Sequence, residues 1–264
     1  MDVSPLNYKL TFEPDLKKFT FNGLESISIN CKKSVNVITM NCAELKIKSC
    51  IVKSGKKIIK SFPKTNEKKE ELQIKLAEKI RGLCTVDLEF EGILNDRLLG
   101  FYRSRYEQNG KTKYLATTQF EAADARRAFP CWDEPEAKAT FEISIIADNQ
   151  FTAISNMPVK TKKKTGKTTI YNFQKTPLVS TYLIYLGVGE FEYLSGKAGK
   201  IQIRVVTTKG NTSKGKFSLE LGKKLLTSYE KYFGIKFPLP KLDLIAVPDF
   251  AAGAMENWGA ITFR

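Results

Sequence analysis

The sequence has 264 residues, of which 42% are hydrophobic and 27% charged, so it is long enough to bury a substantial core without disulfides. It contains no histidine, which excludes a Ser-His-Asp triad and a histidine-rich zinc site built from this chain alone. No apolar run is long enough to span a membrane, and the N-terminus lacks the pattern of a secretory signal.

Lysine and arginine outnumber aspartate and glutamate by 43 to 28, a formal net charge of +15. Such an excess suits a nucleic acid or another anionic partner. The lysines gather in turn-like segments such as 53–64 and 160–167, without the interleaved aromatic residues that stack on bases. Nucleic-acid binding is therefore kept only as an alternative. Five cysteines without a C-x-x-C pair predict reduced, mostly buried thiols in a cytoplasmic protein.

Residues 1–190 alternate between apolar and polar side chains, as half-buried strands do. The pattern is clear in four segments: 24–31, 72–76, 86–90 and 141–145. Turn signals such as Asn22-Gly23 and Asn109-Gly110 separate the segments. Many short strands at this spacing predict a mostly β fold, either a β-sandwich or an open antiparallel β-domain.

The pattern changes near residue 190, after a closing strand expected at 182–187. A helix is predicted over 212–233, because apolar residues recur every four positions: Phe217, Leu221, Leu225, Tyr229 and Phe233. Thr212 or Ser213 is the expected N-cap, and Gly234 the expected C-cap. A buried strand is predicted at 242–248. Residues 191–264 therefore look like the incomplete start of a second, α+β domain.

The segment 253–264, GAMENWGAITFR, has features that suit peptide binding. Gly253 and Gly259 let a backbone approach closely, so the main chain could pair with an extended peptide. Glu256 has no cationic neighbour between residues 249 and 261, and it could receive a peptide's charged α-amino group. The residues alone leave open a simpler reading, a tight turn with Glu256 in solvent.

A second notable segment is 117–143. Gln119 and Glu121 lie two residues apart, so on a strand they would share a face and line a pocket, or else form a polar outer surface. Phe129 and Trp132 are predicted core aromatics. Ion pairs around a turn are expected among six charged residues: Asp124, Arg126, Arg127, Asp133, Glu134 and Glu136.

TTQFEAADARRAFPCWDEPEAKATF, from Thr117, and GAMENWGAITFR resemble the M1 family of zinc aminopeptidases, gluzincins similar to aminopeptidase N and the tricorn-interacting factor aminopeptidases. The resemblance covers essentially the whole chain. It implies a saddle-like antiparallel β-domain over residues 1–190, followed over 191–264 by the first part of a thermolysin-like catalytic domain. It also implies an activity, the hydrolysis of N-terminal residues from peptides.

The resemblance further implies roles for individual residues. Glu256 would bind the substrate's free amino group, Glu121 would be a second acidic anchor, and Gln119 would shape the first specificity pocket. Asn257 would hold the loop. The peptide's path would be lined by Gly253, Ala254 and Met255.

One departure from the family is decisive. The family continues into an H-E-x-x-H helix that holds zinc, a further glutamate ligand and a tyrosine, and these 264 residues contain no such helix. We therefore expect no catalytic residue, no metal ligand and no activity in this chain alone. Zinc would come with a downstream segment or a second polypeptide, which completes either a truncated chain or a naturally split enzyme.

If the chain is truncated or split in this way, residues 195–264 should carry an exposed apolar surface to which a partner can bind. The alternative hypothesis is a non-catalytic peptide-binding or scaffold protein of the same fold.

Overall fold

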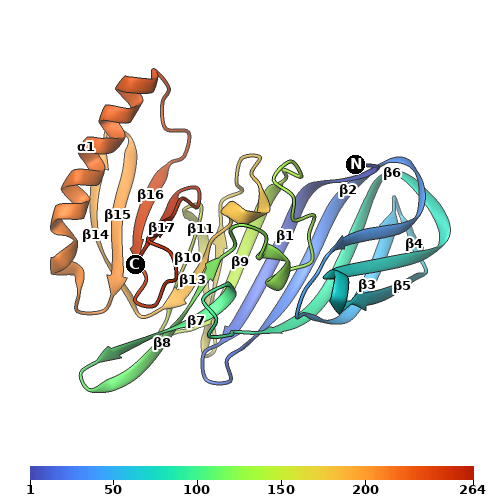
Figure 1. Ribbon diagram of the computed structural model, residues 1–264, viewed down its shortest axis with the longest axis horizontal. Helices are drawn as coiled ribbons and strands as arrows, with labels where there is room; N and C mark the ends of the chain where they lie inside the picture. Colours follow the sequence, from blue (N-terminus) through green and yellow to red (C-terminus); the bar gives the residue numbers. More distant parts are fainter.

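The computed structural model describes residues 1–264, which form eighteen β-strands, one α-helix and four short 3₁₀ segments. Figure 1 shows an elongated molecule with a large sheet at one end, and a helix and a smaller sheet at the other. The predicted mostly β fold is confirmed, and so are all four alternating segments.

The large sheet has nine strands in the order β11-β12-β9-β1-β2-β6-β3-β4, with β5 also paired to β6. Strands β1 and β9 run parallel, whereas the other pairs are antiparallel. Parallel neighbours need a long crossover, and the chain between β1 and β9 supplies it. The strands are β1 (Val3–Asp15), β2 (Thr20–Asn41), β3 (Lys46–Ser54), β4 (Lys57–Ile59), β5 (Ser61–Asn66), β6 (Glu71–Ile93), β9 (Thr140–Asp148), β11 (Val159–Thr165) and β12 (Thr168–Phe173).

A second sheet has the order β10-β13-β8-β7. Its strands are β7 (Gly100–Gln108), β8 (Lys111–Gln119), β10 (Thr152–Ser155) and β13 (Leu186–Gly189). The strand expected at 182–187 is wrong in its first half, because Thr181–Leu183 forms a 3₁₀ turn. Thr181 Oγ1 donates to Asp133 Oδ1 at 2.7 Å, a tertiary contact that holds this turn and that local periodicity does not encode.

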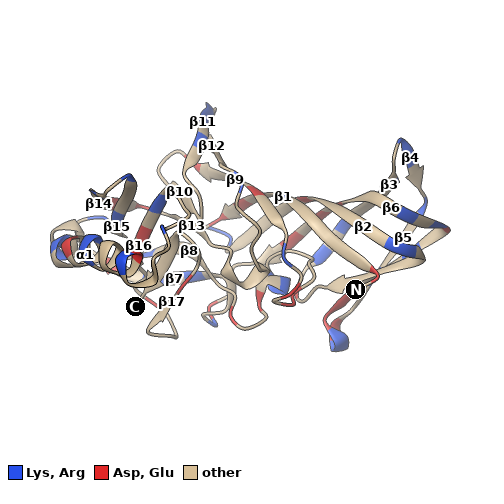
Figure 2. Ribbon diagram, turned by 90° about the horizontal axis from the view of Figure 1, so that it is seen from above, with Lys and Arg blue, Asp and Glu red and all other residues tan.

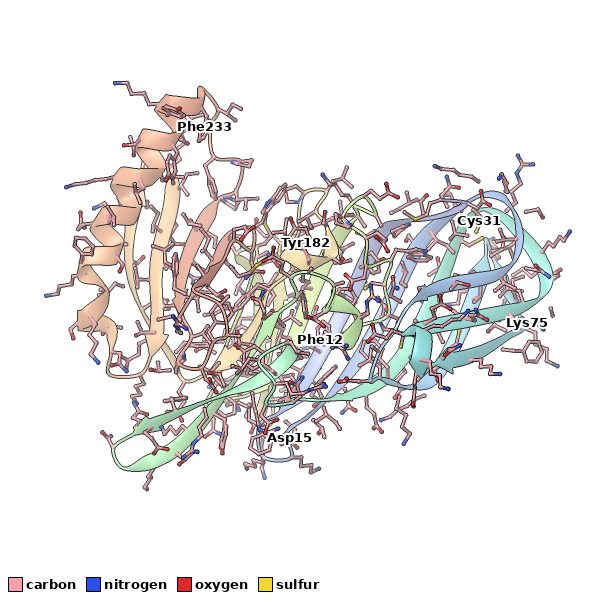
Figure 3. All side chains as sticks on the ribbon, in the orientation of Figure 1. Phe12, Asp15, Cys31, Lys75, Tyr182 and Phe233 are labelled. Carbon is pink, nitrogen blue, oxygen red and sulfur yellow. The ribbon has the colours of Figure 1, made fainter.

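One hydrophobic core of 58 buried residues draws side chains from both sheets. Phe129, which is fully buried, lies at the centre of an aromatic cluster. Its ring centroid is 6.0 to 6.3 Å from those of four others: Tyr8, Phe12, Phe120 and Phe141. Phe12, which Figure 3 labels, is also fully buried. Phe129 and Trp132 are thus core aromatics, as predicted.

The third sheet has the order β14-β15-β16-β18-β17. Its strands are β14 (Phe191–Ala198), β15 (Ile201–Thr208), β16 (Lys241–Ala246), β17 (Ala254–Met255) and β18 (Ala260–Phe263). One face joins the main core through Val206, Ile245 and Met255. The other face packs against helix α1 (Lys216–Phe233), where Ile203, Val205 and Leu242 meet Leu219 and Leu226.

The predicted start of the helix is wrong, whereas its end is confirmed. Residues Thr212–Gly215 form a 3₁₀ turn, and neither Thr212 nor Ser213 caps a backbone N–H. Gly215 precedes α1, and a Cβ there would lie 2.7 Å from Val205 Cγ1, so the close approach to β15 requires glycine. Gly234 ends the helix in the left-handed conformation at φ +68°.

The positions of the cysteines and of the lysine-rich segments also agree with the predictions from the sequence. All five thiols are free, and only Cys50 is not fully buried. The lysines of β4, β5 and β11 lie on projecting hairpins and edges, as the blue ribbon in Figure 2 shows. No helix of the structure combines the length and the apolar composition needed to cross a bilayer.

One buried carboxyl group has no hydrogen-bond partner. Glu25, on β2, is only 3% exposed, and neither of its carboxyl oxygens has a hydrogen-bond partner. Burial raises the pKa of Glu25 well above its ordinary value of 4.5, because water no longer solvates the charged form. The folded protein therefore holds a proton that the unfolded chain releases above pH 4.5.

We expect the Glu25→Met variant to be more stable than the parent at pH 8, by about 1–3 kcal/mol, because it removes an unpaired polar group from the core. The stability of the parent falls as the pH rises above the unfolded-state pKa, so the gain should shrink at pH 5. Urea unfolding at both pH values measures the difference. Glu13→Met, at an exposed position of β1, is the control and should show no such pH dependence. An equal gain at pH 5 and pH 8 would contradict the assignment.

Candidate functional site

The segment 253–264 forms an edge of the third sheet. Strand β18 lies parallel to β16, with Asp243 opposite Ala260, and antiparallel to β17, with Met255 opposite Thr262. Strand β17 is the last in the sheet and has only two residues. One side of its backbone pairs with β18, and no strand pairs with the other side.

The backbone around Glu256 is fixed on both sides. Met255 is fully buried in the main core, and Asn257 is 1% exposed. Asn257 Nδ2 donates to Thr262 Oγ1 at 3.5 Å, and the Asn257 carbonyl accepts from Ala260 N at 3.0 Å. Between these two buried residues Glu256 is exposed, and its carboxylate has no hydrogen bond or ion pair. A free carboxylate thus lies on an anchored backbone.

A buried lysine lies beneath the same loop. Lys241 is 1% exposed, and its Nζ donates to Gly259 O at 2.8 Å, to Ser155 O at 2.7 Å and to Asp243 Oδ2 at 2.7 Å. Burial lowers the pKa of Lys241 to about 8, and the neighbouring Asp243 carboxylate opposes this shift. Arg204 Nε also donates to Asp243, at 2.6 Å. The ammonium therefore joins the loop to strand β10.

Asn156 makes a second connection to the loop. Its Nδ2 donates to Trp258 O at 2.9 Å and to Leu183 O at 2.8 Å, and its Oδ1 accepts from Tyr185 N at 2.9 Å. Gly259 has φ +71°, and a Cβ there would lie 2.5 Å from Asn156 O. Sequence reasoning missed both Lys241 and Asn156. The available signal for Lys241 was a lysine and an aspartate two residues apart on one face of an otherwise apolar strand.

Gln119 and Glu121 do not share a face of a strand, so that expectation is wrong. Gln119 is the last residue of β8 and is 8% exposed, whereas Glu121 lies in the following turn and is exposed. Gln119 Oε1 is buried without a partner, and the Glu121 carboxylate is unpaired. No hydrogen bond joins either side chain to Glu256.

The sheet that carries Gln119 nevertheless contacts the loop leading to Gly253. Tyr102 of β7 donates through its hydroxyl to Asp249 O at 3.0 Å. Asp249 N in turn donates to Ser104 Oγ at 3.0 Å. The two segments singled out in the sequence, 117–143 and 253–264, therefore lie on elements that are in direct contact.

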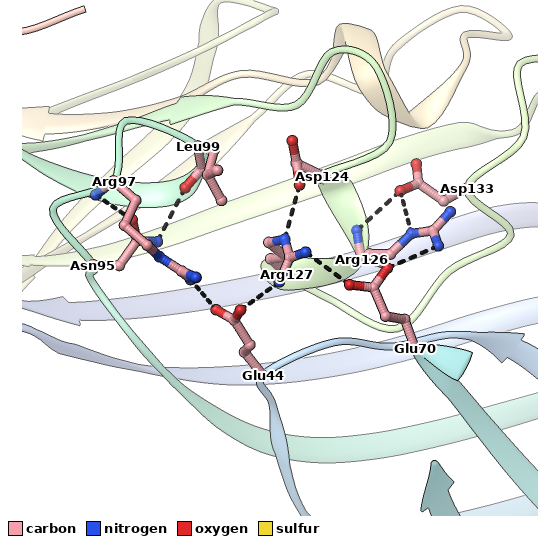
Figure 4. Close-up of polar contacts among 9 residues, drawn as sticks. All are labelled: Glu44, Glu70, Asn95, Arg97, Leu99, Asp124, Arg126, Arg127 and Asp133. Atoms are coloured by element: carbon pink, nitrogen blue, oxygen red, sulfur yellow. Dashed lines mark hydrogen bonds and ion pairs between the residues drawn. The ribbon is translucent and has the colours of Figure 1, made fainter. Parts of the chain in front are cut away.

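The predicted ion pairs around residues 124–136 are partly confirmed (Figure 4). Arg126 pairs with Asp133 at 3.1 Å, and Arg127 pairs with Asp124 at 2.8 Å. Glu134 and Glu136 were also expected to pair, but they are exposed and make no ion pair. The remaining partners come from distant parts of the chain, since Glu44 and Glu70 both bind Arg127.

A cavity of about 960 Å³ lies beside this network. Arg97 and Arg127 line it, but carboxylates already neutralise both. Both of its arginines are therefore paired within the protein, and it is the weaker candidate for a site.

A second cavity of about 780 Å³ is an apolar groove between α1 and the third sheet. The helix packs mainly on β14 and β15, which leaves Leu244 of β16 and Ile261 of β18 partly exposed on the same face. The groove is lined mainly by apolar side chains, among them Leu225, Phe233, Leu244, Ile261 and Phe263. Much of the predicted helix stripe is exposed, 76% for Phe217 and 65% for Phe233, which Figure 3 places at the end of α1. The expected exposed apolar surface is confirmed.

The residues present do not fit a zinc ion. The chain has no histidine, and no three Cys, Asp or Glu side chains are grouped so that they could hold a metal. A metal binds the thiolate form of cysteine, but burial raises the pKa of Cys31 to about 11 and that of Cys42 to about 12.

Comparisons with known proteins identify what the chain resembles. The family model described as the Peptidase M1 N-terminal domain matches residues 4–183, and that of the Peptidase family M1 domain matches residues 217–264.

Among curated relatives, "Aminopeptidase M1" of Arabidopsis thaliana is 42% identical over 98% of this chain and 30% of its own length. "Aminopeptidase 2, mitochondrial" of Saccharomyces cerevisiae is 42% identical over 100% of this chain and 28% of its own length. "Puromycin-sensitive aminopeptidase" of Caenorhabditis elegans is 41% identical, with 99% and 28% covered. The chain thus spans about 30% of the length of these relatives.

Proposed function

The chain belongs to the M1 peptidase family, and we propose that it forms the substrate-binding portion of a zinc metalloaminopeptidase, which hydrolyses N-terminal residues from peptides. The observation that carries the proposal is the state of Glu256: exposed, unpaired, and held between two buried residues at the edge of a sheet. A peptide's α-amino group has a pKa near 7.7–8.0 and is largely charged at neutral pH. It would form a short, directional bond with this carboxylate.

The remaining site residues have complementary proposed roles. A peptide would lie along the side of β17 that has no strand partner, beside Gly253, Ala254 and Met255. Glu121, also an unpaired carboxylate, would be the second acidic anchor for the amine. Gln119, whose buried Oε1 lacks a partner, would shape the first specificity pocket.

The proposal assigns the bond-breaking step to residues outside these 264. Zinc in the completed enzyme would be held by a downstream segment or by a second polypeptide, since no residues here fit the ion. The apolar groove beside α1 supports such a partner, because large apolar side chains, which proteins usually bury, are exposed there.

The proposal also includes a domain boundary and a cellular location. We place a domain boundary between residues 190 and 191, with a β-saddle before it and the first part of the catalytic domain after it, because the third sheet begins at Phe191. A cytoplasmic location is supported by the five free thiols.

The first test is peptide binding by this chain. We expect a tripeptide with a free amino terminus to bind in a calorimeter and its N-acetylated form to bind at least tenfold more weakly. Glu256→Gln should weaken binding of the free-amine peptide by about tenfold, because it removes the charged acceptor of the ammonium group. Glu13→Gln, at an exposed carboxylate of β1, is the matched control and should bind like the parent.

Equal affinity for the free and acetylated peptides would contradict the proposal. Unchanged binding by Glu256→Gln would remove that residue from its assigned role and leave the edge of β17 as the remaining determinant.

A further inference from the structure

We infer that Lys241 is a positioning residue, which together with Asn156 locks the loop that carries Glu256 onto the β-saddle. The inference rests on the proposed function of Glu256. Both side chains bond to carbonyls of the loop, so both would act through the loop backbone rather than on the peptide itself.

The contacts of Lys241 use the full capacity of its ammonium group. The group has three N–H donors, and three acceptors lie within 2.8 Å: a carbonyl of the loop, a carbonyl of β10 and the Asp243 carboxylate. At 1% exposure no water replaces any of them. Since Gly259 lies in the turn before β18 and Ser155 lies in β10 of the second sheet, the ammonium fixes the separation of the two backbones.

Asn156 binds the carbonyl of Trp258, the residue before Gly259, in a similar way. Both hydrogens of its amide nitrogen and its oxygen are used, and the three partners are Trp258 O, Leu183 O and Tyr185 N. Consecutive loop carbonyls, those of residues 258 and 259, are therefore each bound to the saddle by a buried side chain.

These anchors lie two and three residues after Glu256. A bond between a carboxylate and an ammonium group depends steeply on distance, and a displacement of about 1 Å in a positioning element can weaken function strongly. Met255 and Asn257, the residues on either side of Glu256, are buried. The buried cation and amide add a second restraint, because they tie the next part of the same loop to residues 155 and 156.

Two measurements test the inference on the 264-residue chain: amide hydrogen exchange at residues 256–260, and calorimetric affinity for the free-amine tripeptide. We expect Lys241→Met, which keeps the apolar stem, to speed exchange in the loop and to weaken peptide binding, each by about tenfold. Asn156→Ala is the second variant, and it should act in the same direction if Lys241→Met does not fold. Both are measured at a temperature where circular dichroism shows the variant folded.

Phe12→Leu, in the distant saddle core, is the control for general destabilisation and should lower the melting temperature without changing either readout. A folded Lys241→Met or Asn156→Ala with parental exchange and parental affinity would overturn the inference. Glu256→Gln separates the two claims, since it should weaken binding and leave exchange unchanged. If Glu256→Gln binds like the parent, the proposed role of Glu256 fails, and the exchange data still decide whether Lys241 and Asn156 hold the loop.

Discussion

Replacing Asp243 with alanine should lower the free energy of unfolding by about 3–5 kcal/mol, because it leaves buried positive charge without its counterion. Asp243 is fully buried and accepts hydrogen bonds from Lys241 and from both Nε and Nη2 of Arg204. The Lys241 ammonium would retain only two carbonyl partners. Urea unfolding followed by circular dichroism measures the loss.

Asp249→Ala is the matched control, because Asp249 is exposed and only its backbone is used in the structure. Its effect should stay within about 0.5 kcal/mol, as is usual for a surface substitution. A loss of less than about 1 kcal/mol for Asp243→Ala would show that the network is solvated and that its three charges do not depend on one another.

The Phe129→Ala variant should also lose about 3–5 kcal/mol, since it leaves a cavity where an aromatic ring is packed on several sides. The ring contacts Tyr8 and Phe12 of β1, Phe141 of β9 and Phe120 just after β8, so it connects the nine-stranded sheet to the second sheet. Thermal and urea unfolding measure the effect. Phe217→Ala, at a helix position that is 76% exposed, is the control for removal of an aromatic side chain and should change stability little.

A loss for Phe129→Ala no greater than that for Phe217→Ala would mean that the two sheets do not share one core. In that case the nine-stranded sheet and the sheet of β7 and β8 would unfold independently, and the contact of Tyr102 with the loop near Asp249 would not transmit rigidity to the site.

The two substitutions test two different kinds of contact that stabilise the protein. Phe129 holds the sheets together through apolar packing, whereas Asp243 holds a pair of cations beneath the loop that carries Glu256. The first kind of contact forms because burying apolar side chains removes them from water. The second exists only where burial makes an unpaired charge costly.

The sequence by itself allowed us to assign most of the strands, to single out the segments 117–143 and 253–264, and to exclude a histidine-based zinc site built from this chain alone. Strand periodicity is local, since alternate side chains point to opposite faces whatever the strand pairs with. The segment around Leu72 and the one around Val86 could therefore be assigned without knowing their neighbours. The left-handed cap at Gly234 is local for the same reason.

Only the tertiary structure decided what holds Glu256 in place and which surfaces remain open. Lys241 bonds to Ser155, 86 residues away, and Asn156 bonds to Trp258, 102 residues away. Gln119 and Glu121 look alike in the sequence, yet one is buried and the other exposed because β8 ends between them. Such contacts depend on which strands meet and in which register. A hydrogen bond between distant segments leaves no periodic pattern in the chain.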